Sequence, residues 1–496
     1  MTEPDSNSDL IPDPGVNYRW KWGLVAVVIL LCASSFFNMR TGRGKTVNDA
    51  TKLYLDVSIE SRQVYSLQEY SPNSASGKQI ARKLVTNLQE INSITHSANS
   101  TRVLAIIQNF LKDPAWQKTL VGLRTSKPRI DDKPLTAAQI ESEISMWKAI
   151  FTGKTASEQA STYAKLIRTM DLGWHEHLAL LALYKSSGQK NLAEEQSDIL
   201  HSSTIRMGII GILMILVGLV GLGMGILLVA FVAWRRKHPH VRIQPEILNM
   251  YDIRPAEALQ PVQARVLYSI FVIYLCSMAG IRLLMTGIQS QGWLDFMKSM
   301  SPASRMSISI LLAFVTTIPP LLLFLRFRRQ GVVSWNDIGF KRGQTIGDIV
   351  WGICGYFAAL PVIIIVTLIA TQVFKHFTSP VNPAVTDALN SHNMLILFLT
   401  LCEASLMAPL IEETMFRGVF LNALHPSLGR VGSSLTSAGV FAILHPQLPA
   451  GFFSIFTIGL LFNTLYRNRN SLLPGMVAHA INNGSIVLML SLMLAD

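Results

Sequence analysis

Charged residues and cysteines are both scarce in this chain of 496 residues. Only 15% of the residues are charged, whereas 50% are hydrophobic and the mean hydropathy is +0.34. This balance excludes an ordinary soluble enzyme and predicts a polytopic membrane protein. The cysteines all lie in apolar stretches without metal-ligand spacing, so no disulfide framework supports the large polar segment. They are Cys32, Cys276, Cys354 and Cys402.

Several familiar catalytic signatures are also missing. The sequence has no P-loop, no serine nucleophile elbow and no HExxH helix. Its net charge of +12 does not predict a nucleic-acid partner, because lysines and arginines cluster beside apolar stretches, where they set membrane topology. The run His175-Glu176-His177 looks like a set of metal ligands. Consecutive residues on a helix point in different directions, so we expect this run on a helix surface without a metal.

The apolar stretches predict about nine transmembrane helices. The first, Trp20–Phe37, resembles a signal peptide but lacks a small-x-small cleavage site, so we interpret it as a retained signal anchor. The seventh is short for a full crossing, and a shortened or partly re-entrant helix fits it. The nine stretches are 20–37, 207–234, 266–286, 307–325, 346–374, 394–424, 432–447, 450–466 and 472–494.

We therefore expect an all-α fold, with a helical soluble domain inserted between the first and second spans. Apolar residues recur at helical spacing in the polar segment, as in Val103, Ile106 and Phe110. In the second span, Gly221 and Gly225 would let another helix approach closely, although glycine is also simply common in membrane helices.

The domain organisation follows from these stretches. Within the polar segment, 171–199 predicts two short helices joined at Ser187-Gly188. The predicted parts are a disordered tail at 1–18, a signal-anchor helix at 19–39, a helical extracytoplasmic domain at 40–204, a transmembrane helix at 205–237, accessory membrane helices and loops at 238–390, and a membrane core at 391–496.

Basic residues orient the spans. They follow the second, fourth, sixth and eighth stretches, and the opposite short loops hold few of them. The positive-inside rule then predicts a multi-pass protein of the plasma (inner) membrane with a cytosolic N-terminus, and it places 40–204 outside. The basic residues are Arg235, Arg236, Lys237, Arg326, Arg328, Arg329, Lys341, Arg342, Arg430, Arg467 and Arg469.

The segment PLIEETMFRG, residues 409–418, carries two adjacent glutamates within an apolar run. A carboxylate in a lipid-embedded helix costs roughly 2.5–3.5 kcal/mol, which points to chemistry or ion handling. Glu413 and Arg417 are four residues apart and share a helix face, so we expect them to pair. Glu412 is rotated by roughly 100° and faces a different way, toward a cavity. A charge cluster at the membrane surface is the structural alternative.

Two histidines and an asparagine lie in other apolar stretches. His445 follows Phe441 by one turn, and His479 shares a face with Asn483. A buried histidine is ordinarily a core residue whose hydrogen bonds are made locally. Each of these polar groups would cost free energy if it lay alone in an apolar helix, so we expect them to meet Glu412. Such a set supports hydrolysis. A carboxylate activates water, a glutamate with two histidines matches a catalytic zinc site, and an asparagine amide donates to an oxyanion.

The order EExxxR, FxxxH and HxxxN resembles the CAAX protease and bacteriocin-processing family, which includes CAAX prenyl endopeptidase-like and Abi proteins. The resemblance covers residues 391–494 and implies an intramembrane endopeptidase, often open toward the cytosol, of metalloprotease or glutamate-protease type. It implies that Glu412 activates water, with His445 assisting or binding metal. His479 and Asn483 would steady the oxyanion, or His479 would complete a zinc site formed with Glu412 and His445.

The supporting residues implied by the resemblance are Glu413, Arg417 and Phe441. The expected partners are the lipid bilayer, a protein or peptide substrate, and a protein partner of the 40–204 domain. One alternative is a non-catalytic scaffold, sensor or immunity protein that keeps the core as a binding surface. A transporter that uses the ionisable residues as a relay is a further alternative, although no inverted repeat is evident.

Overall fold

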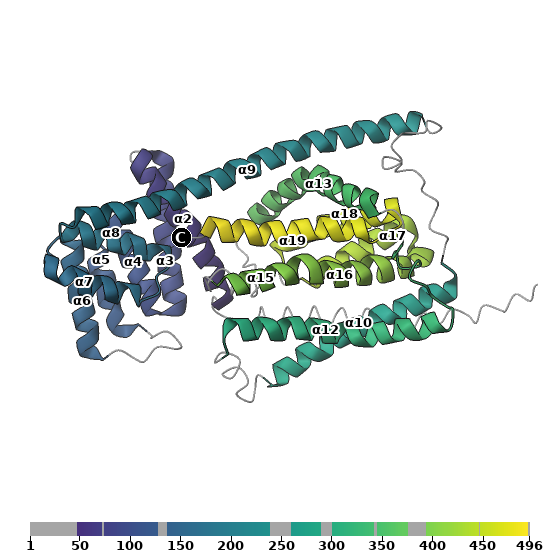
Figure 1. The fold of residues 1–496 in the computed structure, drawn as a ribbon, viewed down its shortest axis with the longest axis horizontal. Coiled ribbons are helices and arrows are strands. Elements are labelled where there is room, and N and C mark those ends of the chain that lie inside the picture. The colour runs from purple at the N-terminus through teal and green to yellow at the C-terminus, as the bar shows by residue number, and fades with distance from the viewer. Residues whose placement is uncertain are drawn as a thin grey trace, which may run out of the picture.

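The structure is a computed structural model. It describes residues 47–71, 74–126, 136–238, 259–288, 300–341, 345–374, 393–445 and 447–494, and within these ranges it contains helices and no strands. The prediction of an all-α protein is confirmed. A helical domain lies at one end of the long axis, and a bundle of longer helices fills the rest (Figure 1). The predicted tail and signal anchor, 1–39, lie outside the described residues.

The helical domain packs around one apolar core that includes Leu84, Ile107 and Trp147. Side-chain caps explain why several of its helices begin where they do. Ser97 caps one helix, and Thr136 forms a capping box with Gln139 at another. The helices are α2 (Val47–Tyr70), α3 (Ala75–Thr95), α4 (Ala98–Phe110), α5 (Trp116–Val121), η1 (Gly122–Thr125), α6 (Ala137–Phe151), α7 (Ser157–Arg168), α8 (Trp174–Ser186) and the first turns of α9 (Lys190–Lys237).

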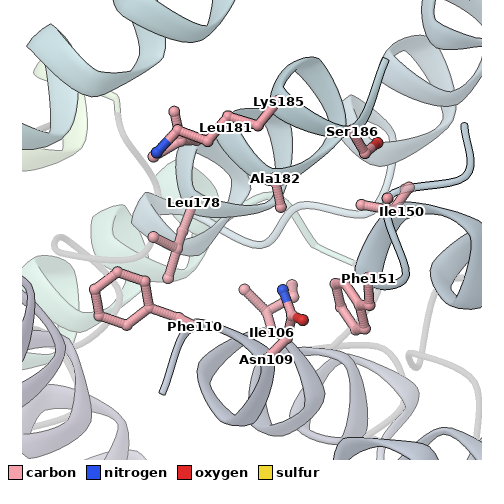
Figure 2. A pocket seen from close by; sticks show the side chains of 11 residues that line it. Ile106, Asn109, Phe110, Ile150, Phe151, Leu178, Leu181, Ala182, Lys185 and Ser186 are labelled. Carbon is pink, nitrogen blue, oxygen red and sulfur yellow. The ribbon is translucent and has the colours of Figure 1, made fainter. Parts of the chain in front are cut away.

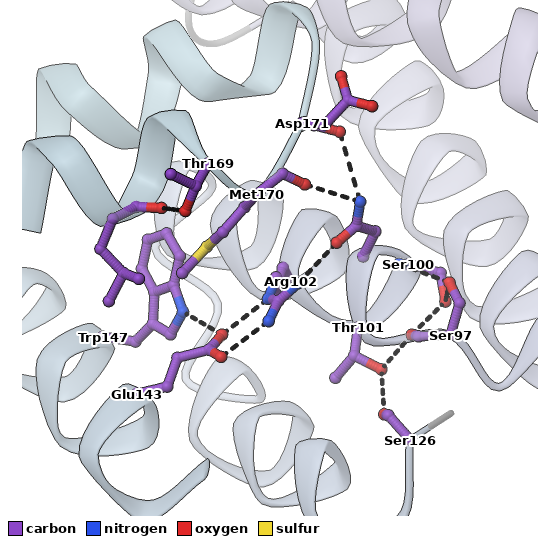
Figure 3. A network of polar contacts seen from close by, with 12 residues as sticks. Ser97, Ser100, Thr101, Arg102, Ser126, Glu143, Trp147, Thr169, Met170 and Asp171 are labelled. Carbon is purple, nitrogen blue, oxygen red and sulfur yellow. Dashed lines mark hydrogen bonds and ion pairs between the residues drawn. The ribbon is translucent and has the colours of Figure 1, made fainter. Parts of the chain in front are cut away.

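A buried ion pair joins α4 to α6 within this domain (Figure 3). The guanidinium of Arg102 donates to both carboxylate oxygens of Glu143 at 2.7 and 2.8 Å, and its third nitrogen donates to Asn99 Oδ1 at 2.6 Å. Trp147 Nε1 also donates to Glu143 at 3.1 Å. Because every nitrogen of Arg102 and both oxygens of Glu143 have partners, burial of the two charges is compensated.

His175 is a core residue, and the expectation of a surface position was wrong for it. It is only 6% exposed, and one ring nitrogen lies 2.9 Å from Ser61 Oγ. Burial, together with the nearby positive charge of Arg62, lowers the pKa of His175 to about 3. Among the described residues no group of three or more His, Cys, Asp or Glu side chains could hold a metal ion.

Helix α9 joins the helical domain to the membrane bundle. The turn at Ser187-Gly188 separates α8 from α9 as predicted, but the second helix is not short, because α9 continues for 48 residues. Neither proline nor a close pair of glycines interrupts it before the apolar stretch begins. The predicted boundary at 204/205 therefore concerns where the membrane begins and does not mark the end of a helix.

Six of the described helices are long and apolar enough to cross a membrane. The predicted number of nine spans stays a prediction. The first span lies outside the described residues, 394–424 and most of 432–447 fall within one of the six candidates, and 450–466 is not among the candidates. The remaining helices are α10 (Pro261–Ile288), α12 (Pro302–Arg329), α13 (Thr345–Val373), α15 (Met394–Cys402), η4 (Glu403–Met407), α16 (Ala408–Glu413), η5 (Thr414–Leu421), α17 (Asn422–Ile443), α18 (Ala450–Arg469) and α19 (Leu473–Leu494).

Small residues bring α9 against α13, as Gly221 and Gly225 suggested. A Cβ at Gly221 would collide with the carbonyl oxygen of Phe357, and one at Gly225 would lie 3.0 Å from the carbonyl oxygen of Ala358. Helix α13 in turn approaches α19, where a Cβ at Gly352 would lie 2.6 Å from the carbonyl oxygen of Pro474. The long helix is thus joined to the core through α13.

Helix α17 changes direction at Gly429, whose φ of +64° favours glycine. The part after Gly429 forms an antiparallel hairpin with α18, and the guanidinium of Arg467 donates to the carbonyl of Arg430 at the hairpin's open end. Arg469 pairs with Asp348 of α13 at 2.8 Å beside it. Three of the basic residues that were expected on the cytosolic side, Arg430, Arg467 and Arg469, therefore gather at one end of the bundle, which we call the basic end.

Candidate active site

The two adjacent glutamates lie on a helix with unusual turns. Two π-helical stretches, η4 and η5, flank the short α16 that ends with Glu412 and Glu413. A π-helical turn adds a residue and rotates the side chains that follow it, and such turns occur frequently at functional sites. The same helix delivers Glu413 into the interior and leaves Glu412 half-buried beside two histidines.

Glu413 lies at the centre of a buried polar cluster. Its Oε1 accepts from Arg417 Nη1 at 3.1 Å and from His479 Nδ1 at 2.9 Å. The side chains of Glu413 and Arg417 are 0% exposed, and Arg417 Nη2 also donates to the carbonyl of Gly459 at 3.3 Å. The guanidinium lies over the ring of Phe441, 4.4 Å from its centroid. The predicted pairing of Glu413 with Arg417 is therefore present.

Glycine makes room for this cluster on α19. A Cβ at Gly475 would lie only 2.8 Å from Glu413 Oε2, which is closer than a methyl group tolerates. His479 follows one turn later on the same helix and is stacked on the ring of Phe462, with centroids 4.9 Å apart. The glycine and the ring together fix where Glu413 and His479 meet.

Glu412 lies between the two histidines. Its Oε2 is 3.9 Å from His445 Nε2 and 3.8 Å from His479 Nε2, distances too long for direct hydrogen bonds. This oxygen is buried and has no hydrogen-bond partner among the described residues, although the whole side chain is 26% exposed. The structure thus brings together the three groups that the sequence analysis placed in one site.

The other ring nitrogens of the histidines determine what faces Glu412. His445 Nδ1 lies 2.7 Å from the carbonyl oxygen of Phe441, which only accepts, so Nδ1 carries the proton. His479 Nδ1 donates in the same way to the Glu413 carboxylate. When these rings are neutral, each presents the lone pair of Nε2 toward Glu412. With both rings neutral, the site is a cluster of three acceptor atoms, which suits a species that carries hydrogen or positive charge.

Comparison with known proteins identifies this region. Residues 393–485 match the family model described as "Type II CAAX prenyl endopeptidase Rce1-like". This match supports a C-terminal core of the CAAX protease and bacteriocin-processing type. The chain is also 26% identical over 181 residues to a Bacillus subtilis (strain 168) protein described as "Putative membrane peptidase YdiL", covering 36% of this chain and 69% of that protein. No solved structure matches the chain.

Asn483, the remaining predicted catalytic residue of this family core, lies one turn beyond His479. Its amide nitrogen donates to the carbonyl of Ala404 in η4 at 3.1 Å, and its oxygen accepts from Asn482 at 3.0 Å. These bonds hold η4 against α19. Only one of the two amide N–H groups is used, so the second is left for an oxyanion, and that role stays a prediction.

A zinc site with Glu412, His445 and His479 as ligands was one of the two possibilities that the sequence left open. Ligands bonded to zinc at about 2.0–2.1 Å in a tetrahedron lie about 3.3–3.4 Å apart. The separations of 3.8 and 3.9 Å around Glu412 Oε2 are wider by about half an ångström than zinc requires. The donor types suit zinc, but their spacing as it stands does not, and we derive no step through a metal.

The sequence analysis missed several residues of the family core. Gly459, Phe462 and Gly475 hold the cluster through tertiary contacts that leave no pattern in the sequence. Glu403 did leave a signal, since it is a further carboxylate in the apolar run that begins at Met394. Its Oε1 accepts from Ser309 of α12 at 3.3 Å, and its buried Oε2 has no hydrogen-bond partner in the described part of the chain.

Proposed function

We propose that this protein is an intramembrane endopeptidase in which Glu412 activates water. The cluster of three acceptors carries the proposal. Glu412 Oε2 lies 3.8–3.9 Å from each imidazole Nε2, so a water held among them can donate one hydrogen to the carboxylate and the other to an Nε2 lone pair. A carboxylate next to a held water is the arrangement of a general base.

The reaction is peptide-bond hydrolysis. The water oxygen forms a bond to the carbonyl carbon of the substrate while Glu412 accepts one of the water's protons. The tetrahedral intermediate then collapses, the C–N bond breaks, and Glu412 returns the proton to the leaving nitrogen, so the products are a carboxylic acid and an amine. Nε2 of His445 or His479 accepts the other hydrogen of the water and orients it, and the second amide N–H of Asn483 is the proposed donor to the oxyanion.

The buried cluster behind the water has a positioning role in this proposal. Glu413 fixes the tautomer of His479, and Arg417 neutralises Glu413. Phe441 contributes its carbonyl to His445 and its ring to Arg417. Such outer partners keep a catalytic group within the narrow range of productive orientations.

We further propose that the site opens toward the cytosol. His479 lies six residues after Leu473, which corresponds to about 9 Å of helix from the basic end. The positive-inside rule places that end in the cytosol, with the 40–204 domain on the opposite side. The proposed substrate is a membrane-associated protein or peptide, because a polar site at this depth is reached from within the bilayer or from its surface.

Replacement of Glu412 tests the catalytic role. We expect Glu412→Gln to lower cleavage by about 10²–10⁴-fold, the range for loss of a general base, without loss of folded protein. The measurement is a proteomic comparison of membranes that contain the wild type or the variant, followed by cleavage of the peptides that differ. Glu403→Gln is the matched control, since it neutralises another carboxyl group on the same helix. Cleavage that is equal in the wild type and Glu412→Gln would leave the core as a non-catalytic scaffold.

Treatment with a chelator tests whether cleavage requires a metal ion. Because the acceptor spacing is too wide for zinc, we expect cleavage by the purified protein to survive 1,10-phenanthroline. Metal analysis of the same sample should find less than one zinc per chain. Loss of cleavage that is restored by added Zn²⁺ would instead show that the three groups close around a metal.

A further inference from the structure

A pocket of about 360 Å³ lies in the helical domain, far along the chain from the membrane core (Figure 2). Its walls come from α4, α6 and α8, and most of its lining is apolar. The ring of Phe110 lies on one side and the ring of Phe151 on the other, with Ile106 and Asn109 between them and side chains of α8 across the opening. Its size and composition are those of a small-ligand site.

The walls of this pocket are held before any ligand arrives. Phe110 is stacked on Tyr65 with centroids 5.7 Å apart, and Phe151 meets Trp147 at 5.5 Å. The ion pair of Arg102 with Glu143 locks α4 to α6 behind them (Figure 3). A ligand that enters the pocket therefore needs little reorganisation of the domain.

Two polar groups at the pocket have no partner in the described part of the chain. The amide of Asn109 lies between the two rings, and the ammonium of Lys185 lies at the rim on α8. Lys185 is the charged residue that lines the pocket, and no lining residue is acidic. The charge of the rim therefore favours an anionic group.

The position of the pocket argues against a bilayer lipid. Helix α8 packs antiparallel on the first turns of α9, with Trp174 Nε1 bonded to Ser203 and Lys185 near the start of α9. The exposed apolar face of α9 begins only at Ile205, about 20 Å further along the helix. The occupant therefore reaches the pocket from the aqueous side.

We propose that this pocket binds an extended peptide that inserts one large apolar side chain and presents a carboxylate to Lys185. A peptide group supplies both a donor and an acceptor for the amide of Asn109, which an acyl chain cannot do. The apolar side chain fills the space between Phe110 and Phe151. The carboxylate comes from the peptide's C-terminus or from an acidic side chain.

Fluorescence polarisation with the full chain in nanodiscs tests the proposal. The Glu412→Gln background keeps the peptides intact, so the result does not depend on the proposed function. The probes are labelled hexapeptides that end in Leu, Phe or Ser, each with a free or an amidated C-terminus, and an amidated peptide with Glu next to an internal Phe. We expect the free acids with Leu or Phe to bind at least about tenfold more tightly than their amides, and those with Ser not to bind. Binding of the internal-Glu peptide at the level of the free acids assigns the carboxylate to a side chain, and binding at the level of the amides assigns it to the C-terminus.

Variants of the pocket complete the test. Lys185→Gln should weaken binding of the free acids by about tenfold or more and bring it to the level of the amides. Ala182→Phe should remove binding by filling the pocket, whereas Lys165→Gln, an exposed lysine on α7, should leave it unchanged. Equal binding of acids and amides, an unaltered affinity in Lys185→Gln or Ala182→Phe, or no binding of any probe would overturn the proposal.

Discussion

Two buried arginine–glutamate pairs stabilise different regions of this protein, and they differ in how completely they are satisfied. In the helical domain, Arg102 and Glu143 use every nitrogen and oxygen of the pair. In the membrane core, Arg417 Nε and Glu413 Oε2 are buried without hydrogen-bond partners among the described residues. Glu413 shares its other oxygen with a histidine that belongs to the candidate site.

This difference separates a structural pair from one that acts on a neighbour. A complete network fixes two helices and has no unused group. In an incomplete network, buried polar atoms without hydrogen bonds destabilise the fold. Such atoms are retained where the arrangement of the network serves another purpose. In the core that purpose is to fix the tautomer and orientation of His479, because Glu413 Oε1 accepts a hydrogen bond from its Nδ1–H. Substitutions in the two pairs should therefore have different consequences for folding and for cleavage.

The largest effect is expected from removal of each arginine. Arg102→Met and Arg417→Met both leave an uncompensated buried carboxylate, which costs about 3–5 kcal/mol. Hydrogen exchange of the full chain should show the loss in α4 and α6 for Arg102→Met. Cleavage per folded molecule should persist in Arg102→Met and be lost in Arg417→Met, because only Arg417 positions Glu413 and His479.

Double variants separate folding from function in the two pairs. Arg102→Met with Glu143→Gln should recover much of the lost stability, since no buried charge remains. Arg417→Met with Glu413→Gln should recover folded protein but not cleavage, because His479 loses its carboxylate. Recovery of cleavage in that double variant would show that the core pair is as purely structural as the other one.

A smaller effect is expected from the glycine that makes room for Glu413. Gly475→Ala places a methyl group 2.8 Å from Glu413 Oε2, and overpacking of this kind costs about 1–3 kcal/mol. We expect cleavage to fall through kcat as Glu413 and His479 move. Gly439→Ala on α17 is the control, because its Cβ would have no neighbour within 4 Å. An equal loss of cleavage in both variants would mean that helix flexibility, and not the position of Glu413, is what the glycine provides.

Part of this site could be predicted from the sequence. The four-residue spacing of Glu413 and Arg417, and the cost of lone polar groups in lipid, were enough to expect their pairing and the meeting of Glu412 with His445 and His479. The structure places these groups together, while their catalytic roles remain predictions.

Other features were beyond the sequence. The π-helical turns, and the contacts of Gly475 with Glu413, arise only when α16 and α19 pack together. The prediction that His175 lies on a helix surface was also wrong, because the residues beside it in the sequence do not show which face of its helix another helix covers. The all-α class was predictable from apolar periodicity, but the unbroken course of α9 was not, since polar and apolar halves of one helix look like separate elements.

At neutral pH the smallest effect is expected from the titration of a buried histidine in the helical domain. His175 has an ordinary pKa near 6.5 when unfolded, and burial lowers its pKa to about 3 in the folded domain, with the charge of Arg62 acting in the same direction. Between these values the unfolded state binds the extra proton, so the stability contributed by the neutral ring is complete above pH 6.5 and declines as the pH falls toward 3. The slope is at most about 1.4 kcal/mol per pH unit. Hydrogen exchange in α2 and α8 should follow this slope in the wild type and lose it in His175→Gln, which retains polar atoms to face Ser61. A slope that persists in His175→Gln and disappears in His177→Gln would assign the titration to His177. It would also contradict the view that the helical domain, unlike the membrane core, keeps its buried polar groups for structure alone.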